Sequence, residues 1–130
     1  MVDLVALERM AGEEYADIVM DAYRVDAKLR VLLIDDSYLD FWWSEVEQGR
    51  FAHHWNRQHV DGTIHRHDNS PHRKWHHIET FPQHYHRERE DAVSASFLPE
   101  EPHEAVRAFL TFCREVMRAG GTPSAVPGSP

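Results

Sequence analysis

Histidine is concentrated in one part of this chain. Ten of the 11 histidines lie between residues 50 and 89, and the densest run, HRHDNSPHRKWHH, spans residues 65–77. Imidazole transfers protons near neutral pH and also binds divalent transition metals. Arg66, Arg73 and Lys74 are interleaved with this run, and His84 and His86 follow as a second His-x-His pair. Residues 50–86 are therefore expected to form the functional surface.

Metal binding is one chemistry open to these residues. Alternate side chains of a strand lie on one face, so each His-x-His pair could direct two imidazoles at one ion. Asp68 or His72 could complete a set of four ligands. On this interpretation the cofactor is zinc, and its alternative ligands are His65, His67, His84 and His86.

Metal-free cleavage of RNA is a second chemistry. It needs a base for the 2′-hydroxyl, an acid for the leaving oxygen and a cation for the phosphate. Histidine suits both proton-transfer roles, and arginine suits the phosphate. The expected catalytic residues are His72, His84, His86 and Arg66. Basic and aromatic side chains nearby could contact phosphates and stack on unpaired bases, and these RNA-binding residues are Arg73, Lys74, Trp75 and Tyr85.

Binding without chemistry is the third alternative. Trp, Tyr and Arg are enriched in the energetic centres of protein interfaces, so an open face rich in them could dock a protein partner. The simpler interpretation is that Trp42, Trp43 and Trp55 are core residues. Asp68, Asn69 and Pro71 have turn-forming chemistry and are expected to shape the site by bonding backbone amides, without transferring protons.

Charge is divided unevenly along the chain. The whole chain has a formal net charge of −8, yet residues 50–89 carry seven basic and four acidic residues, a local charge of +3. Partial protonation of the histidines would add to that charge. The acidic total therefore does not exclude RNA as a partner of this surface.

Alternating apolar residues predict a sheet in the middle of the chain. Leu29, Val31 and Leu33 alternate before a turn at residues 35–37, and a second alternating run follows at residues 39–43. Residues 51–59 and 63–68 flank Asp61-Gly62, a tight hairpin signal. Residues 27–68 are expected to form a four-stranded antiparallel meander, with a further short strand at residues 93–97.

Two amphipathic helices are expected at residues 4–23 and 102–118, because apolar residues recur there at spacings of three and four. The fold class is α+β: an antiparallel four- to five-stranded meander with an N-terminal and a C-terminal helix packed on one face. Residues 1–121 are expected to form a single domain, and residues 122–130, rich in Gly, Pro and Ser, are expected to form a disordered C-terminal tail.

Composition narrows the setting of the protein. No apolar run approaches the roughly 18 residues of a membrane span, and no leader-like stretch precedes Asp3. A cytoplasmic protein without membrane association is expected. The single cysteine, Cys113, lies at an apolar helix position and is expected to be a small core residue.

The histidine region also resembles a known family. The run Arg66-His67-Asp68-Asn69-Ser70-Pro71-His72, followed by Thr80-Phe81-Pro82-Gln83-His84-Tyr85-His86, resembles the TumE-like toxins of prokaryotic toxin–antitoxin modules. Those proteins typically show Arg-x-Asp-Asn-Ala-Pro-His-His and then Thr-Phe-Pro-His-His-x-His. This sequence departs from that pattern at Ser70, Arg73 and Gln83. By position, the resemblance selects Arg66, Asp68, Asn69, Pro71, His72, His84 and His86.

The resemblance implies a toxin neutralised by a cognate antitoxin protein, with a homodimer left open. By analogy with other small toxins, the expected activity is that of an endoribonuclease that needs no metal and acts on RNA through a His/Arg site. The alternative is a non-catalytic or metal-binding interaction module whose histidine-rich face is a partner site.

Overall fold

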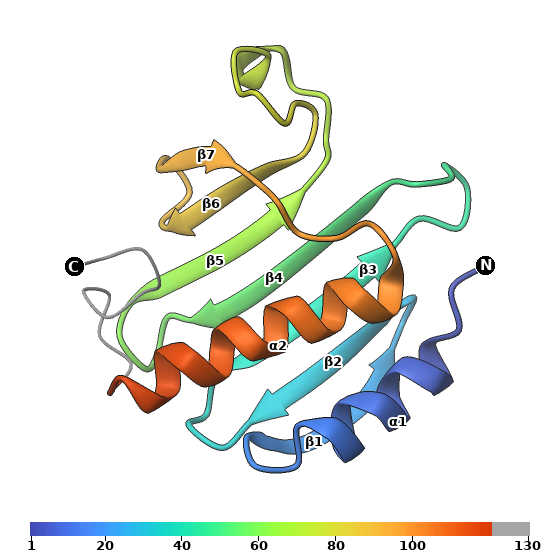
Figure 1. Cartoon of the computed structure of the whole chain (residues 1–130), viewed down its shortest axis with the longest axis vertical. Helices are drawn as coiled ribbons and strands as arrows, with labels where there is room; N and C mark the ends of the chain where they lie inside the picture. Colours follow the sequence, from blue (N-terminus) through green and yellow to red (C-terminus); the bar gives the residue numbers. More distant parts are fainter. Residues whose placement is uncertain (121–130) are drawn as a thin grey trace.

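Seven strands and two helices make up the part of the chain that the computed structural model describes, residues 1–120. The strands form one antiparallel sheet in chain order, and both helices lie on one face of it (Figure 1). The elements are α1 (Leu4–Glu14), β1 (Val19–Val25), β2 (Lys28–Leu33), β3 (Tyr38–Trp43), β4 (Phe51–Arg57), β5 (Thr63–Asp68), the 3₁₀ turn η1 (Arg73–Trp75), β6 (His84–Glu88), β7 (Val93–Ala95) and α2 (Pro102–Arg118).

The α+β class is confirmed, with a larger sheet than the sequence predicts. The predicted four-stranded meander corresponds to β2–β5, and the short strand expected at residues 93–97 is β7. Within residues 1–120 the number of strands is seven and not four to five, because β1 and β6 are additional. The prediction of a disordered tail at residues 122–130 lies outside the described residues.

Strand β1 replaces the second half of a predicted helix. Helix α1 ends at Glu14 and not near residue 23. Residues Val19–Val25 then pair with β2, with a register shift between Val19 and Asp21. In this edge strand every third residue is half-buried and the others are exposed, a spacing close to the period of a helix, which explains why the sequence predicts a helix here.

Strand β6 lies between the strands predicted at residues 63–68 and 93–97, where the sequence predicts no strand. Its residues, HYHRE, are polar on both sides, so no apolar alternation marks them. The backbone of β5 nevertheless gains a partner, since Asp68 pairs with His84 and Arg66 pairs with His86. Strand β6, with two histidines, therefore lies directly beside β5, which carries two histidines and Asp68.

The core lies between the sheet and the helices. Leu29, Leu39 and Phe41 of the sheet pack with Phe109 of α2, and all are buried. Helix α2 begins with the side chain of Glu101 accepting backbone N–H bonds from residues 103 and 104. Its buried positions form one apolar stripe: Ala105, Val106, Phe109, Leu110, Cys113 and Val116.

Several histidines belong to this core. The rings of His65 and His67 contact Phe112 and Phe109 edge-on, with centroid distances of 5.2 Å in both pairs. His53, opposite His67 in the sheet, is 1% exposed. Alternation then places Arg66 and Asp68 on the face that the helices leave uncovered.

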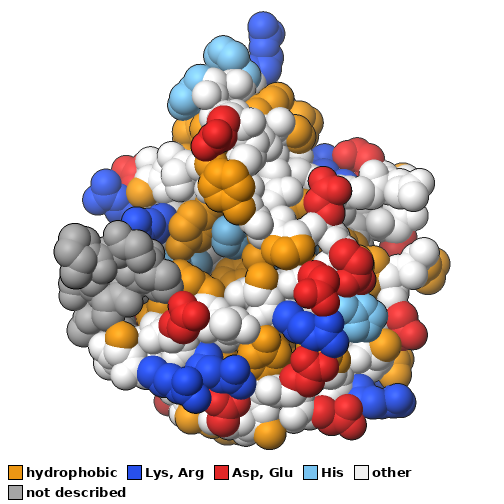
Figure 2. All heavy atoms as spheres, in the orientation of Figure 1, with side chains coloured by type: hydrophobic (Ala, Val, Ile, Leu, Met, Phe, Trp, Pro, Cys, Tyr) orange, Lys and Arg blue, Asp and Glu red, His pale blue; other side chains and the backbone are white. Residues whose placement is uncertain are grey.

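The segment between β5 and β6 projects beyond the sheet. It carries η1 and stands at the top of Figure 1, away from both helices. Histidine and basic side chains gather there, whereas acidic and basic side chains are interleaved over the lower part of the same view (Figure 2). None of the helices described here is long and apolar enough to cross a membrane.

Candidate functional site

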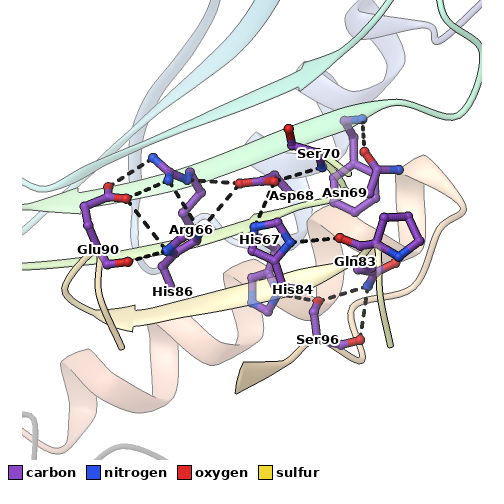
Figure 3. A network of polar contacts seen from close by, with 12 residues as sticks. Arg66, His67, Asp68, Asn69, Ser70, Gln83, His84, His86, Glu90 and Ser96 are labelled. Carbon is purple, nitrogen blue, oxygen red and sulfur yellow. Dashed lines mark hydrogen bonds and ion pairs between the residues drawn. The ribbon is translucent and has the colours of Figure 1, made fainter. Parts of the chain in front are cut away.

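Four polar side chains converge on the uncovered face of β5 and β6. Arg66 and Asp68 alternate along β5 and have His86 and His84 as their partners in β6. Opposed residues of neighbouring strands direct their side chains to the same face. Two segments about 16 residues apart in the sequence thus form one cluster (Figure 3).

Asp68 and His84 form a buried carboxylate–imidazole pair. The His84 Nε2 atom lies 3.1 Å from Asp68 Oδ1, and the two residues are 1% and 7% exposed. His84 Nδ1 lies 2.8 Å from the carbonyl oxygen of Pro82. Because a carbonyl only accepts hydrogen bonds, Nδ1 carries the hydrogen and Nε2 is the atom directed at the carboxylate.

His86 repeats this arrangement one step along β6. Its Nδ1 donates to the carbonyl oxygen of Glu90 at 2.7 Å, so Nε2 carries the lone pair of the neutral ring. Nε2 lies 3.8 Å from Asp68 Oδ2 and 3.4 Å from an Arg66 guanidinium nitrogen. Burial lowers the pKa of His86, which favours the neutral form, whose Nε2 lone pair accepts the bond from Arg66.

Arg66 places a cation beside this ring. Its Nε donates to Asp68 Oδ2 at 3.1 Å, and its terminal nitrogens donate to the Glu90 carboxylate at 3.0 and 2.6 Å. Glu88, with φ +69°, bends the chain after β6, and Glu90 follows in that turn. The guanidinium is partly exposed, so it can exchange a carboxylate for a phosphate.

A cleft of about 430 Å³ opens above the cluster. Ala52, opposite Asp68 in the sheet, contributes only a methyl group to the floor. The projecting segment supplies one wall, where Trp75 lies about 6 Å from both the His84 and His86 rings. The lining residues are Trp42, Arg50, Phe51, Ala52, Arg66, Asp68, Ser70, His72, Lys74, Trp75, His84, His86 and Glu90.

The turn after β5 is held by bonds from Asp68 and Asn69, two of the residues expected from the sequence to shape the site. Asp68 Oδ1 accepts the Ser70 N–H at 3.0 Å. Asn69 accepts the Phe51 N–H at 2.9 Å and donates to the carbonyl of Gly49 at 2.7 Å. These bonds tie the start of the projecting segment, with Pro71 in it, to the start of β4. Asp68 has an additional role, since it also contacts His84 and Arg66.

Some predicted site residues lie outside the cleft. Tyr85 is on the helix side, where its ring stacks on His67 at 4.4 Å and its hydroxyl lies 2.7 Å from His65 Nδ1. Burial lowers the pKa of His65 to about 4 and that of His67 to about 3. The sheet therefore separates His65 and His67 from His84 and His86, and these four do not converge. Arg73 is exposed beside the cleft and does not line it.

Other cleft residues were missed by sequence reasoning. Glu90 forms an ion pair with Arg66. The wall of the cleft is lined by Arg50 and Trp42, and the small side chain of Ala52 leaves room for the cleft. Glu90 comes four residues after His86, within one turn of the chain, but no sequence pattern marks it as a partner of Arg66. Ala52 carries no chemical signal at all, because its contribution is its small size.

The donor atoms of Asp68, His84 and His86 lie within 4.8 Å of one another, close enough for one metal ion.

Comparison with known proteins identifies the family of this chain. A family model described as Toxin TumE matches residues 3–118. This chain belongs to the Toxin TumE family. Searches of curated proteins and of solved structures gave no match.

The TumE match extends over all the helices and strands described above. Membership of a toxin family implies a toxin-like function and an antitoxin partner. The two runs that resemble TumE-like toxins are the two segments that build the cleft. Where this chain departs from the TumE-like pattern, Ser70 accepts a bond from Arg50 at 3.2 Å, and Gln83 donates to the Leu98 carbonyl at 2.8 Å.

Proposed function

We propose that this toxin cleaves RNA in the cleft between β5, β6 and the projecting segment. The observation that carries the proposal is the position of the His86 Nε2 lone pair. It lies 3.4 Å from the Arg66 guanidinium and beside the buried Asp68–His84 pair. A proton acceptor next to a cation is what attack on a phosphodiester requires.

The proposed reaction is transfer of the phosphodiester to the neighbouring 2′-hydroxyl. The bond from the 2′-oxygen to phosphorus forms, the bond from phosphorus to the 5′-oxygen breaks, and a cyclic phosphate results. The cluster of Asp68, His84 and His86 takes the proton of the 2′-hydroxyl. His72, exposed at the rim of the cleft, returns a proton to the leaving 5′-oxygen. Arg66 holds the phosphate as its charge increases.

The walls of the cleft favour a nucleic acid over a small neutral substrate. Trp75 presents an aromatic ring at the cleft, and the Lys74 ammonium lies 4.7 Å from the centroid of that ring. An aromatic ring beside a cation can stack on an unpaired base and hold the adjacent phosphate. Single-stranded RNA, whose bases are accessible for stacking, is therefore the proposed substrate.

Cleavage of fluorescently labelled single-stranded RNA tests the proposal. The purified protein is incubated with the RNA in buffer containing divalent metal ions, and growth is followed in cells that express it with and without its antitoxin. His72→Ala should lower the cleavage rate by about 10²- to 10⁴-fold, as expected for loss of a general acid. His76→Ala is the matched control, because His76 is exposed on the same segment but does not line the cleft.

The role of His72 would be contradicted if His72→Ala and His76→Ala lost the same amount of cleavage activity, or if neither variant lost any. A wild-type protein that arrests growth and binds its antitoxin but cleaves no RNA would overturn the proposed reaction. The cleft would then be a docking site for a partner protein.

A further inference from the structure

We propose that Asp68, His84 and His86 bind one divalent transition metal ion, with zinc as the ion of choice. Two imidazole nitrogens and one carboxylate oxygen are a common donor set for such ions. All three residues are more than nine-tenths buried, and the cleft opens directly above them. The binding site stands on geometry alone, whereas its use in catalysis rests on the RNA cleavage proposed above.

The orientation of the two imidazoles is the decisive observation. His84 and His86 each donate Nδ1–H to a backbone carbonyl, those of Pro82 and Glu90, at 2.8 and 2.7 Å. Metal-binding histidines typically use one ring nitrogen in this way, which fixes the tautomer and leaves the other nitrogen for the ion. Both Nε2 atoms are thus preset as ligands and lie close to the same carboxylate (Figure 3).

The distances are close to those of an occupied site. His84 Nε2 and His86 Nε2 lie 3.1 and 3.8 Å from the nearest oxygens of Asp68. Zinc with bonds of about 2.1 Å in tetrahedral geometry separates neighbouring ligands by about 3.4 Å. All three ligand atoms lie within 4.8 Å of one another, so small side-chain rotations bring them to this separation. Three protein ligands leave a coordination position toward the cleft, as in catalytic zinc sites.

Arg66 is the cation that a metal ion would have to accommodate. Its guanidinium contacts two of the proposed ligands, Asp68 and His86 Nε2, but two further bonds to the Glu90 carboxylate hold it independently. Arg66 can therefore release both ligands and keep an ion pair. It would then lie beside the ion, where a phosphate could contact both.

A metal ion would specify how the cluster takes the proton of the 2′-hydroxyl. Zinc would lower the pKa of its bound water toward neutrality, and the resulting hydroxide would accept the proton in place of the His86 Nε2 lone pair, which would then bind the ion. This inference differs from the sequence-based expectation of a metal-free reaction. It also replaces the ligands His65 and His67 by Asp68, because the two histidines lie on the other face of the sheet.

Isothermal titration with zinc chloride tests the site without RNA. Protein freed of metal by chelation should bind one zinc ion per chain tightly, and cobalt(II) at the same site should give the visible absorption of a tetrahedral complex. His86→Ala and the conservative His86→Gln should each weaken this binding by at least about 10-fold. His76→Ala/His77→Ala removes an exposed pair of histidines and should leave the tight site intact. Circular dichroism checks that each variant is folded.

No saturable zinc binding by the wild-type chain would overturn the inference. So would tight binding that persists in folded His86→Ala or disappears in His76→Ala/His77→Ala, since the site would then be the surface pair. The metal site and the proposed function can be refuted independently. A chain that binds zinc but cleaves no RNA would support the metal site and refute the proposed function. A chain that binds no zinc and cleaves RNA undiminished in EDTA would support the proposed function and refute the metal site.

Discussion

Acid should unfold this protein through histidines that the fold keeps neutral. His53 is 1% exposed and lies among the rings of Phe41, Trp43 and Phe51, at centroid distances of 5.2, 4.5 and 4.8 Å. Its Nδ1 accepts the Trp42 N–H at 3.3 Å. Burial lowers the pKa of His53 to about 3, with the positive charge of protonated His67 as a further cause.

The sign of the effect follows from proton uptake. An unfolded histidine titrates near 6.5, so between about pH 6.5 and about pH 3 the unfolded chain binds a proton that folded His53 does not. This contribution to stability is complete above pH 6.5 and is lost as the pH falls. Lowering the pH from about 7.5 to about 5 therefore costs about 2 kcal/mol for His53 alone.

Two neighbouring buried histidines make stability depend more steeply on pH. His67, with its pKa lowered to about 3, and His65, with its pKa lowered to about 4, each contribute a loss of similar size over this interval. The combined loss approaches the 5–15 kcal/mol typical of whole domains. The transition to the unfolded state should therefore begin in mildly acidic solution.

Urea unfolding at a series of pH values, followed by tryptophan fluorescence, measures this slope. His53→Asn, whose amide oxygen can still accept the Trp42 N–H, should lose about 2 kcal/mol less than the wild type between about pH 7.5 and about pH 5. Val31→Ala removes buried apolar atoms without removing a titratable group and should displace the whole curve in parallel. A wild-type stability that is flat over this interval, or an unchanged slope in His53→Asn, would refute the reasoning.

Three further substitutions test other parts of the structure. Ala52→Leu should fill the cleft and abolish RNA cleavage, while the melting temperature stays close to that of the wild type; retained cleavage would show that the substrate binds elsewhere. Lys74→Ala should weaken RNA binding and reduce the slope of log affinity against log salt by about 1, whereas Arg89→Ala, an exposed cation outside the cleft, should do neither. Arg57→Met should lower the free energy of unfolding, measured in urea, by about 2 kcal/mol or more, because Arg57 is 1% exposed and its 2.8 Å bond to a partly exposed Asp35 is lost. An unchanged free energy of unfolding would show that this ion pair contributes nothing to stability.

Local patterns in the sequence were sufficient for much of the fold. Leu29, Val31 and Leu33 alternate because a strand has a period of two, and they occupy buried positions of β2 as predicted. The apolar stripe of residues 102–118 and the Asp61-Gly62 turn are likewise local signals. Gly62 adopts φ +81°, a conformation that glycine reaches without strain. The residues that shape the turn after β5 were also predictable, because Asp and Asn bond nearby backbone groups.

The composition of the site needed the tertiary structure. Alternation separates His65 and His67 from Arg66 and Asp68, but only the contacts of Phe109 and Phe112 decide which pair faces the helices. The pairing of β5 with β6 is nonlocal, and it brings His84 and His86 to Asp68 and moves Tyr85 to the other face. A sequence fixes which side chains share a face of a strand, because that depends on neighbouring residues. Which face is covered, and which strand lies opposite, depends on packing between distant segments.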